Sequence, residues 1–390
     1  MTALAIDGVL PAMPMIEADF SLLPPYSGGQ IITIFVLGMA VGELLIGPFM
    51  DATGRRPAVI GGLVLFGIGT IIAGTADSYG AVVAGRFLQG VGIAGPKIGT
   101  RAMIRDRYAG TDMAQVMSVI FTLLILIPMI APAIGAVIVA TSGWRGVFWA
   151  YLAMAVGLGA WLWTRHPETL PVDKRIPLQF RRLATNCRIV LTRSDVAPVI
   201  VATGLIFGAQ LTYFSVAADL FGAVYDLSAS MPAFFALLAT GTGAALLLNV
   251  RFVGRTGMEP PILIGLTLLG LSGALLLVAA ALTDGHPPLV IFLGLGWIGF
   301  FALGLLFGNL NALAMRPLGE LAGLGSSIIA SVSSLVAFVF AFTVEVAADS
   351  PVWAVAWAFA LAAPPSAILI LLAFPANSRL RLWRFLQIFR

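Results

Sequence analysis

Apolar residues run along this chain in long stretches that short polar segments separate. Most stretches contain about twenty residues, the length of helix that crosses the ~30 Å hydrocarbon core of a bilayer. Backbone polar groups in lipid must be satisfied within their own segment, so runs of this length are expected to be transmembrane helices. The pattern predicts twelve spans: 1–16, 27–49, 57–76, 81–103, 113–140, 144–164, 196–219, 229–250, 260–283, 287–314, 321–346 and 351–374.

One polar stretch, 165–195, interrupts this pattern near the middle of the chain. It divides the chain into an N-terminal bundle of six spans, 1–164, and a C-terminal bundle of six, 196–376. We interpret the stretch itself as a cytoplasmic linker. A basic tail, 377–390, alternates arginines with leucine, tryptophan and phenylalanine, and it is either an interfacial helix or a frayed end.

The two halves resemble each other in the loop that follows their second span. Gly54-Arg55 in the first half aligns with Gly254-Arg255 in the second at an offset of 200 residues. Two similar six-helix halves are a transporter design in which the substrate site lies between the halves. The same offset places the start of the first span before residue 1, so we expect the sequence to lack the start of its first helix.

Composition supports a membrane protein. Hydrophobic residues make up 59% of the chain and charged residues only 10%, whereas a soluble domain carries about 25% charged residues. The single cysteine, Cys187, excludes a disulfide framework within the chain, and both histidines lie in predicted loops. We therefore expect no metal site and no cofactor. The net charge of +4 is too small and too scattered to indicate nucleic-acid binding.

The positions of lysine and arginine predict the orientation in the membrane, because cytoplasmic loops carry an excess of both. With the N-terminus in the cytoplasm, all but three of the 22 basic residues fall in cytoplasmic loops, at cytoplasmic helix ends or in the tail. Of those three, Arg145 lies on the outer side, while Arg86 and Lys97 lie within the fourth span. We therefore expect both termini in the cytoplasm.

Ionisable side chains inside a membrane are costly, and each is a candidate functional residue. Asp7 lies about 15 Å below the outer end of the first span, just before the helix-disturbing Pro11 and Pro14. Arg86 lies about 9 Å below the outer end of the fourth span. Asp7 is either a proton carrier or a permanently paired carboxylate. Arg86 is either the electrostatic switch of Asp7 or a static partner of a backbone carbonyl.

Glu43 and Lys97 lie at similar depths in the second and fourth spans, about 12–14 Å above the inner boundary. Similar depth and opposite charge predict a buried ion pair between these two spans. Such a pair is either a polar anchor for the substrate or a structural clamp.

Four motifs carry a resemblance to a known family. They are the loop Gly47…Asp51…Gly54-Arg55-Arg56, Arg86-Phe87-Leu88-Gln89-Gly90 in the fourth span, Ile6-Asp7-Gly8-Val9-Leu10-Pro11-Ala12-Met13-Pro14 in the first, and Ala131-Pro132-Ala133-Ile134-Gly135 in the fifth. Together they resemble the major facilitator superfamily, and within it the drug:proton antiporters of the Bcr/CflA type. The antiporter motif, with Pro132 and Gly135, departs from many members by having Ala131 in place of glycine.

This resemblance implies the major facilitator fold, an all-α polytopic membrane protein with twelve transmembrane helices in two pseudo-symmetric six-helix bundles. It also implies that Arg86 takes part in proton coupling. Asp51 is expected to latch the outward-facing state by hydrogen-bonding a neighbouring helix end, and Gly54 to have a positive φ angle. The alternative for this loop is a simple cluster of topogenic charges. The family more often has neutral residues at the positions of Glu43 and Lys97, so no family role transfers to them.

The cavity between the halves is expected to be apolar and aromatic, because drug sites are mostly hydrophobic with a few polar groups. Candidates from the spans that usually line the cavity in this fold are Phe121, Phe207, Gln210, Tyr213, Phe214, Phe234, Phe235, Phe301, Phe307, Asn309 and Asn311. Periodicity cannot separate cavity-facing from lipid-facing rings on helices that are apolar all round. The amide groups are alternatively interhelical hydrogen-bonding residues.

We therefore expect a monomeric secondary transporter of the bacterial inner membrane that exports lipophilic or amphiphilic drug-like compounds in exchange for protons. The chain has no GxxxxGK[ST] motif, which disfavours an ATP-driven pump. One alternative is a proton-coupled or facilitative transporter of a metabolite such as a sugar or organic anion, with Arg86 and Lys97 as anion ligands. A membrane enzyme or receptor is a second alternative, against which the lack of a catalytic histidine or cysteine cluster counts.

Overall fold

The computed structural model describes residues 1–23, 26–108 and 110–373, without the side chains of 110–111, 113–115, 117–125, 180, 182 and 319–324. The basic tail 377–390 and the side chain of Phe121 therefore lie outside the described residues. In chain order the elements are α1 Thr2–Asp7, η1 Leu10–Ala12, α2 Met13–Asp19, α3 Gln30–Thr53, α4 Arg55–Gly74, α5 Tyr79–Arg107, α6 Gly110–Arg165, η2 Val172–Lys174, α7 Phe180–Thr192, α8 Ala197–Asp219, η3 Leu220–Val224, η4 Ser228–Ser230, α9 Met231–Thr256, α10 Glu259–Leu282, α11 Leu289–Met315, η5 Arg316–Leu321, α12 Ala322–Ala347 and α13 Pro351–Ala373.

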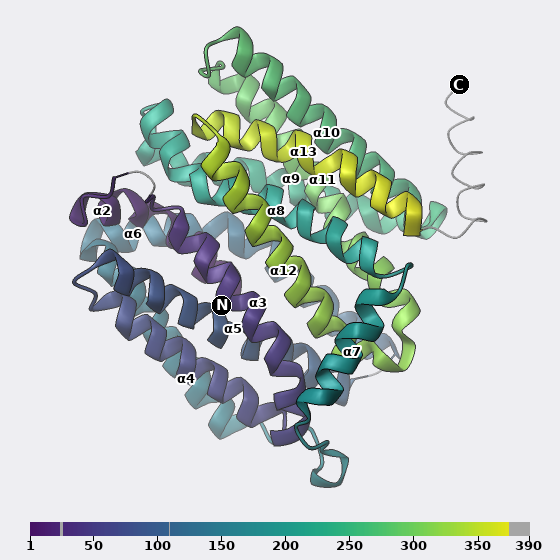
Figure 1. The fold of residues 1–390 in the computed structure, drawn as a ribbon. Coiled ribbons are helices and arrows are strands. Elements are labelled where there is room, and N and C mark those ends of the chain that lie inside the picture. The colour runs from purple at the N-terminus through teal and green to yellow at the C-terminus, as the bar shows by residue number, and fades with distance from the viewer. Residues whose placement is uncertain (24–25, 109, 374–390) are drawn as a thin grey trace.

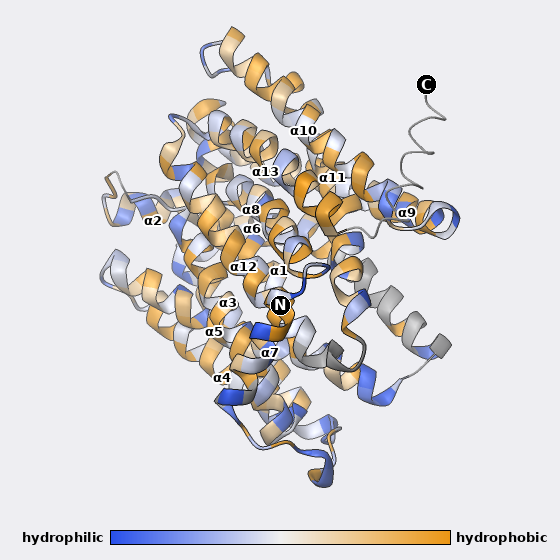
Figure 2. Ribbon diagram, turned by 45° about the vertical axis from the view of Figure 1, so that its right-hand side comes forward, coloured by the Kyte–Doolittle hydropathy of each residue, from blue (hydrophilic) through white to orange (hydrophobic). Residues whose placement is uncertain are grey.

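Twelve membrane crossings follow from these elements. The first consists of α1, η1 and α2, and α6 supplies both the fifth and the sixth because its backbone leaves helical geometry at Gly143 (φ 68°, ψ −179°). Length and composition alone identify nine membrane-spanning helices in the described residues. The first crossing is too broken and α5 is not apolar enough for that criterion, and α6 counts once. Hydrophobic residues occupy most of the length of the helices, and hydrophilic residues gather mainly near the helix ends (Figure 2).

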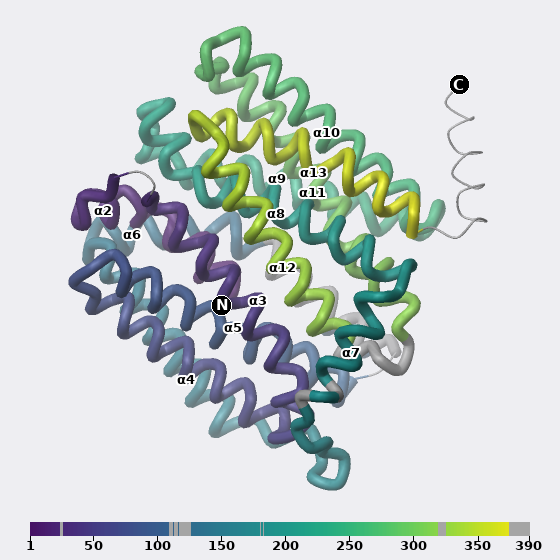
Figure 3. Tube along the Cα trace, in the orientation of Figure 1, coloured from purple at the N-terminus to yellow at the C-terminus, as the bar shows by residue number. Residues whose placement is uncertain are grey.

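The crossings form two bundles, with α1–α6 in one and α8–α13 in the other (Figure 1). The bundles meet where α3 packs against α12 and where α6 packs against α9. Figure 3 shows α3 and α12 running side by side through the middle of the molecule. The expected all-α fold of twelve helices in two six-helix bundles is confirmed.

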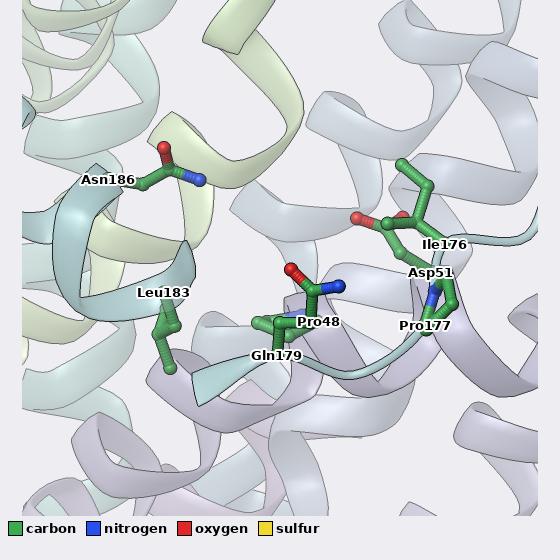
Figure 4. Close-up of a pocket in the computed structure, with 7 residues that line it drawn as sticks. All are labelled: Pro48, Asp51, Ile176, Pro177, Gln179, Leu183 and Asn186. Atoms are coloured by element: carbon green, nitrogen blue, oxygen red, sulfur yellow. The ribbon is translucent and has the colours of Figure 1, made fainter. Parts of the chain in front are cut away.

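The segment between the bundles is more ordered than a polar linker. It contains α7, a 13-residue helix that buries Asn186 and Val190 and exposes Arg181 and Arg188. Before α7 the linker runs over the end of α3, where the Ile176 N–H donates to the Asp51 carbonyl oxygen at 2.9 Å. Figure 4 shows this segment beside Pro48 and Asp51. The many charged residues of this stretch favoured a linker, and the amphipathic helix α7 was not predicted.

The internal repeat holds, but its alignment needs a correction. The turn between α3 and α4 is made by Gly54, whose φ angle is 109°, and the corresponding turn between α9 and α10 is made by Gly257, whose φ angle is 83°. Gly254, which the sequence offset pairs with Gly54, lies inside α9. A short Gly-Arg match therefore placed the equivalence three residues too early.

Candidate functional site

The first crossing is broken beside Asp7, the last residue of α1. Asp7 is 2% exposed, and its Oδ1 atom has no hydrogen-bond partner among the described residues. The chain continues through Gly8 into the short η1 helix, where Pro11 has no N–H to extend an α-helical ladder. The break therefore leaves an unpartnered carboxylate oxygen in the interior of the first half.

The antiporter motif of the fifth crossing packs against this break. Gly135 lies so close to the first crossing that a Cβ atom there would collide with the Gly8 carbonyl oxygen. Pro132 lies one turn earlier in α6, where it cannot donate to the helical ladder. The Tyr151 hydroxyl, from the sixth crossing, donates to the Leu4 carbonyl oxygen at 2.9 Å. Both crossings of α6 thus hold the segment that carries Asp7.

Arg86 is fully buried, and three groups occupy its guanidinium. It donates to the Ile31 carbonyl oxygen at 2.9 Å, to Gln89 Oε1 at 2.9 Å and to the Ala5 carbonyl oxygen at 3.1 Å. No ion pair in the described part of the chain joins Arg86 to Asp7. In this conformation Arg86 therefore ties α5 to α1 and α3 through backbone carbonyls.

The structure brings Glu43 and Lys97 together. Lys97 Nζ lies 2.5 Å from Glu43 Oε1, and the Glu43 side chain is fully buried while that of Lys97 is 24% exposed. The second carboxylate oxygen of Glu43 accepts a hydrogen bond from the Ser334 hydroxyl of α12 at 3.0 Å. One turn away, the Ser331 hydroxyl donates to the Ala40 carbonyl oxygen at 2.7 Å. The pair therefore belongs to a polar seam between the two halves.

The loop motif forms a charge cluster at one end of the bundle, which we call the basic end. Arg55 pairs with Asp51 at 2.5 Å and with Asp106, at the end of α5, at 3.3 Å. The φ angle of 109° at Gly54 turns the chain between α3 and α4, as expected from its position. Gly47 and Asp51 also border a hollow of about 70 Å³ that Ser327 of α12 shares. Asp51 thus pairs with Arg55 of its own half and shares a hollow with Ser327 of the second half.

Glu168 from the linker caps the helix that follows Gly54. Its carboxylate accepts hydrogen bonds at 2.8 to 3.1 Å from the backbone N–H groups of Arg55, Arg56, Thr169 and Leu170. Burial alone would raise the pKa of Glu168, but these four donors outweigh it and lower the pKa below its ordinary value. Arg56 also donates to the Trp163 carbonyl oxygen and lies over that ring. The linker, the loop motif and α6 are therefore fastened together at the basic end.

The halves also meet at the opposite end, which we call the acidic end because Glu17, Asp219 and Glu345 lie there. The Ser27 hydroxyl of the first half donates to Glu345 of the second at 2.9 Å. A Cβ atom at Gly29 would collide with the Ser215 carbonyl oxygen, so the two backbones touch. The acidic end is closed in this conformation.

A cavity of about 580 Å³ lies between the halves and extends to the basic end. It reaches from Phe214, Phe235 and Phe300 to Arg101 and Met315, which lie near the ends of α5 and α11. Most of its wall is apolar. A cavity that is closed at one end and continues to the other has the form of one state in an alternating-access cycle.

The structure separates the predicted cavity residues into two groups. Gln210, Phe214, Phe235, Phe307 and Asn311 line the cavity. The described lining does not include Phe207, Tyr213, Phe234, Phe301 or Asn309. These pack elsewhere in the second half: Asn309 bonds Asn249 of α9 at 2.7 Å, for example, and Phe301 stacks on Trp297. The periodicity of an all-apolar helix could not make this separation.

Sequence reasoning missed three residues of this site: Arg101, Glu168 and Ser334. Arg101 was counted only among the basic residues that set the orientation, although it falls four residues after Lys97 and hence on the same helix face. Glu168 gave no signal, because its partners are backbone groups brought together by the fold. Ser334 lies in a serine-rich stretch of α12, which was a weak signal for interhelical hydrogen bonds.

The comparison with known families identifies the architecture. The family model described as Major Facilitator Superfamily matches residues 1–341. The chain belongs to this superfamily. Members of the superfamily are transporters, so the protein is a polytopic membrane transporter and not an enzyme.

Within the major facilitator superfamily, the chain is similar to bacterial resistance proteins. It is 28% identical over 330 residues to the bicyclomycin resistance protein homolog of Haemophilus influenzae. The aligned region covers 84% of this chain and 81% of that relative. It is 28% identical over 327 residues to the multidrug resistance protein MdtL of Salmonella typhimurium, covering 83% and 79%. The resemblance to the Bcr/CflA type is confirmed by these relatives.

Solved structures share the fold. The human organic anion transporter MFSD10 (TETRAN) superposes with a TM-score of 0.72 at 18% identity, covering 95% of this chain and 96% of that one. The D-xylose-proton symporter superposes with a TM-score of 0.70 at 15% identity, covering 93% of both. At these identities the likeness concerns the fold alone.

Proposed function

We propose that this major facilitator exports lipophilic or amphiphilic drug-like compounds and takes up protons in exchange. The proposal rests on two features of the same molecule: an apolar cavity of about 580 Å³ between the halves, and Asp7 of the first half, a buried carboxylate with an unpartnered oxygen among the described residues. Apolar and aromatic walls suit drug-like molecules. A buried carboxylate is suited to gain and lose a proton, because the membrane interior disfavours its charged form. The resistance proteins among the relatives support the same direction.

In the proposed cycle, Arg86 and Asp7 form a switch. Here the guanidinium binds two carbonyl oxygens and Gln89. In the other state it turns to Asp7, which favours the charged carboxylate and releases the proton. Each proton that enters contributes about 2.3 kcal/mol per 100 mV of membrane potential. Substrate in the cavity shifts the equilibrium between these two states of the transporter, and this couples substrate export to proton entry.

We place the protein in the bacterial inner membrane as a monomer, with both termini and the basic end in the cytoplasm. The excess of lysine and arginine at the basic end supports this orientation. A topology reporter fused after residue 390 should be active only in the cytoplasm. Activity only in the periplasm would overturn the orientation, and with it the assignment of the open end.

The main test is a drug-susceptibility panel in a host that lacks its own exporters, with and without expression of this chain. Expression should lower susceptibility to some amphiphilic compounds. Inside-out vesicles from the same cells should then accumulate those compounds only while a proton gradient exists, and a protonophore should abolish the accumulation. Accumulation that survives the protonophore would refute proton coupling while leaving export intact.

A metabolite transporter is the second candidate, and the cavity wall bears on it. A sugar requires many hydrogen-bonding groups, whereas this wall offers Gln210, Thr242, Asn311 and Ser326 among mainly apolar side chains. Arg101 on the same wall favours an anion over a sugar. Uptake of a radiolabelled sugar or small organic acid by whole cells, driven by an inward proton gradient, would establish this alternative.

A further inference from the structure

Within the described part of the chain, the cavity between the halves is bordered by a positive charge that has no ion-pair partner. Among the described residues that line it, Arg101 alone carries a charge. Gln210, Thr242, Asn311 and Ser326 provide polar groups, and the rest of the wall is apolar or aromatic. None of the described residues in this wall is a carboxylate that could pair with the guanidinium.

The neighbouring charges do not neutralise Arg101. Lys97, one turn earlier on α5, pairs with Glu43 at 2.5 Å, and the other oxygen of Glu43 accepts from Ser334. Glu43 attracts Arg101 electrostatically, but Arg101 takes part in none of the ion pairs within the described part of the chain. Two cations therefore share one carboxylate. Among the side chains that the structure describes, one net positive charge therefore remains beside the cavity.

Arg86, also in the first half, already has hydrogen-bond acceptors for its guanidinium. Arg86 is fully buried and donates to three acceptors, so it is not offered to the cavity in this conformation. Arg101 differs because its side chain is exposed to the cavity space near the basic end. Guanidinium groups bind carboxylate, sulfonate or phosphate oxygens through two parallel N–H donors. The second half supplies the aromatic surface that an attached ring system would contact.

From this arrangement we infer that the cavity selects amphiphiles that combine an aromatic body with a single anionic group, and that Arg101 is the residue that determines this preference. The inference rests on the proposed function, since it takes the cavity to be the substrate site. It narrows the substrate class from drug-like compounds in general to monoanionic ones. A charge-assisted hydrogen bond of this kind corresponds to a preference of about 10- to 100-fold.

Two dyes that share one ring system test the inference. N-phenyl-1-naphthylamine is neutral, and 8-anilinonaphthalene-1-sulfonate has the same ring system and one sulfonate. Their binding to the full chain in nanodiscs is measured by equilibrium dialysis against empty nanodiscs. The wild type should bind the sulfonate about 10- to 100-fold more tightly than the amine. Arg101→Gln should remove that preference and leave amine binding unchanged.

Arg105→Gln is the matched control. It removes the same charge one turn further along α5, from a residue outside the described cavity lining, and should leave the preference intact. Arg101→Lys keeps the charge without the planar fork and should retain part of the preference. If Arg101→Gln loses both dyes, a retained preference in Arg101→Lys supports the inference, and loss of both dyes in both variants overturns it.

The outcomes separate this inference from the function on which it rests. Amine binding without a preference for the sulfonate overturns the role of Arg101 and leaves a drug-binding cavity standing. A sulfonate preference that Arg105→Gln removes as fully as Arg101→Gln reflects general surface charge and also overturns it. If neither dye binds the folded wild type above the empty nanodisc, both the inference and the proposed substrate site fail.

Discussion

The two halves of this major facilitator share a fold but bury different chemistry. In the described part of the chain, the buried Asp, Glu and Arg side chains all belong to the first half: Asp7, Glu43 and Arg86. The second half buries hydroxyl groups and the amide of Asn309, and it supplies all of the described cavity lining except Arg101 and Pro128. Buried charges are costly unless they are paired. The scaffold therefore concentrates its charges in one half and its apolar wall in the other.

The charges within the first half also differ from one another. Arg86 has three acceptors and Glu43 has two donors, so both are satisfied where they lie. Asp7 has an oxygen without a partner among the described residues. A buried carboxylate that lacks donors is the group best suited to change its protonation state. On the proposed function, the first half carries the proton coupling and the second half binds the substrate.

The strongest test of this division is Asp7→Asn. The change removes the proposed proton site but keeps the size of the side chain, so uphill export should be abolished while substrate binding in the second half persists. Substrate-induced proton release from detergent-solubilised protein and proton-driven accumulation in inside-out vesicles measure the two properties. Asp77→Asn, at an exposed carboxylate of the same half, is the control and should leave both unchanged.

Proton release and uphill export that persist in Asp7→Asn would make Asp7 a structural residue. Glu43 would then become the leading proton carrier. Proton coupling would still be carried by a residue of the first half, but by one at the seam with the second half. Loss of substrate binding in Asp7→Asn would contradict the division itself.

The ion pair at the seam gives the next largest effect. Lys97→Met leaves the fully buried Glu43 carboxylate without its paired cation, which costs about 3–5 kcal/mol of stability, and Glu43→Gln, which leaves the 24% exposed Lys97, should cost less. The double variant should recover part of that loss, because the two residues touch. Unfolding in denaturant provides the double-mutant cycle. Strictly additive losses would mean that the pair contributes no coupling.

A pair of adjacent serines tests whether the seam joins the halves. Ser334→Ala removes the hydrogen bond to Glu43 across the seam, whereas Ser333→Ala removes one to the Ile200 carbonyl oxygen within the second half. Each costs about 1 kcal/mol by itself. Only Ser334→Ala should change the effect of Glu43→Gln. Equal coupling of both serines to Glu43 would contradict a specific contact between the halves.

Much of the fold could be predicted from the sequence, because the apolar runs are long and the lipid environment leaves helices as the means of satisfying the backbone. The contact between Glu43 and Lys97 followed from helix rise. Both helices run in the same direction, and the number of residues from each side chain to the inner boundary places the two at similar depths. The acceptors of Arg86 did not follow, because they are backbone carbonyls that become neighbours only when α1, α3 and α5 pack together. Which aromatic rings line the cavity could not be predicted, because a helix that is apolar all round has no distinct polar face.

The two equivalent turns offer a comparison across the halves. At Gly54, with φ of 109°, a Cβ atom would lie 2.5 Å from Glu168 Oε2, whose carboxylate is held by four N–H donors. At Gly257, with φ of 83°, it would lie 3.0 Å from Glu259 Oε2 at the end of a flexible side chain. Gly54→Ala should cost about 3 kcal/mol and Gly257→Ala about 1 kcal/mol. Thermal unfolding compares them, and equal losses would mean that backbone strain alone sets the cost.

A small effect is expected at the cap that distinguishes these turns. Glu168→Gln keeps an acceptor but removes the negative charge at the start of α4, which should cost about 1 kcal/mol near neutral pH. The control is Glu259→Gln in the second half, whose carboxylate is 4.0 Å from Arg316 and has no comparable set of backbone donors among the described residues. Its effect on stability should be smaller.

The stability difference between wild type and Glu168→Gln should depend on pH in a way that follows from the direction of the pKa shift at Glu168. Burial acts to raise the pKa, yet the four backbone donors lower it below the ordinary value of 4.5. A carboxylate with a lowered pKa in the folded state stabilises the protein fully above its unfolded-state pKa, and that contribution disappears as the pH falls through the folded-state pKa. The gap in Tm between wild type and Glu168→Gln should therefore be constant near neutrality and narrow only below about pH 4.5. A gap that narrowed between about pH 8 and pH 6 would point to a different titrating group and would remove Glu168 as the source of the asymmetry between the turns.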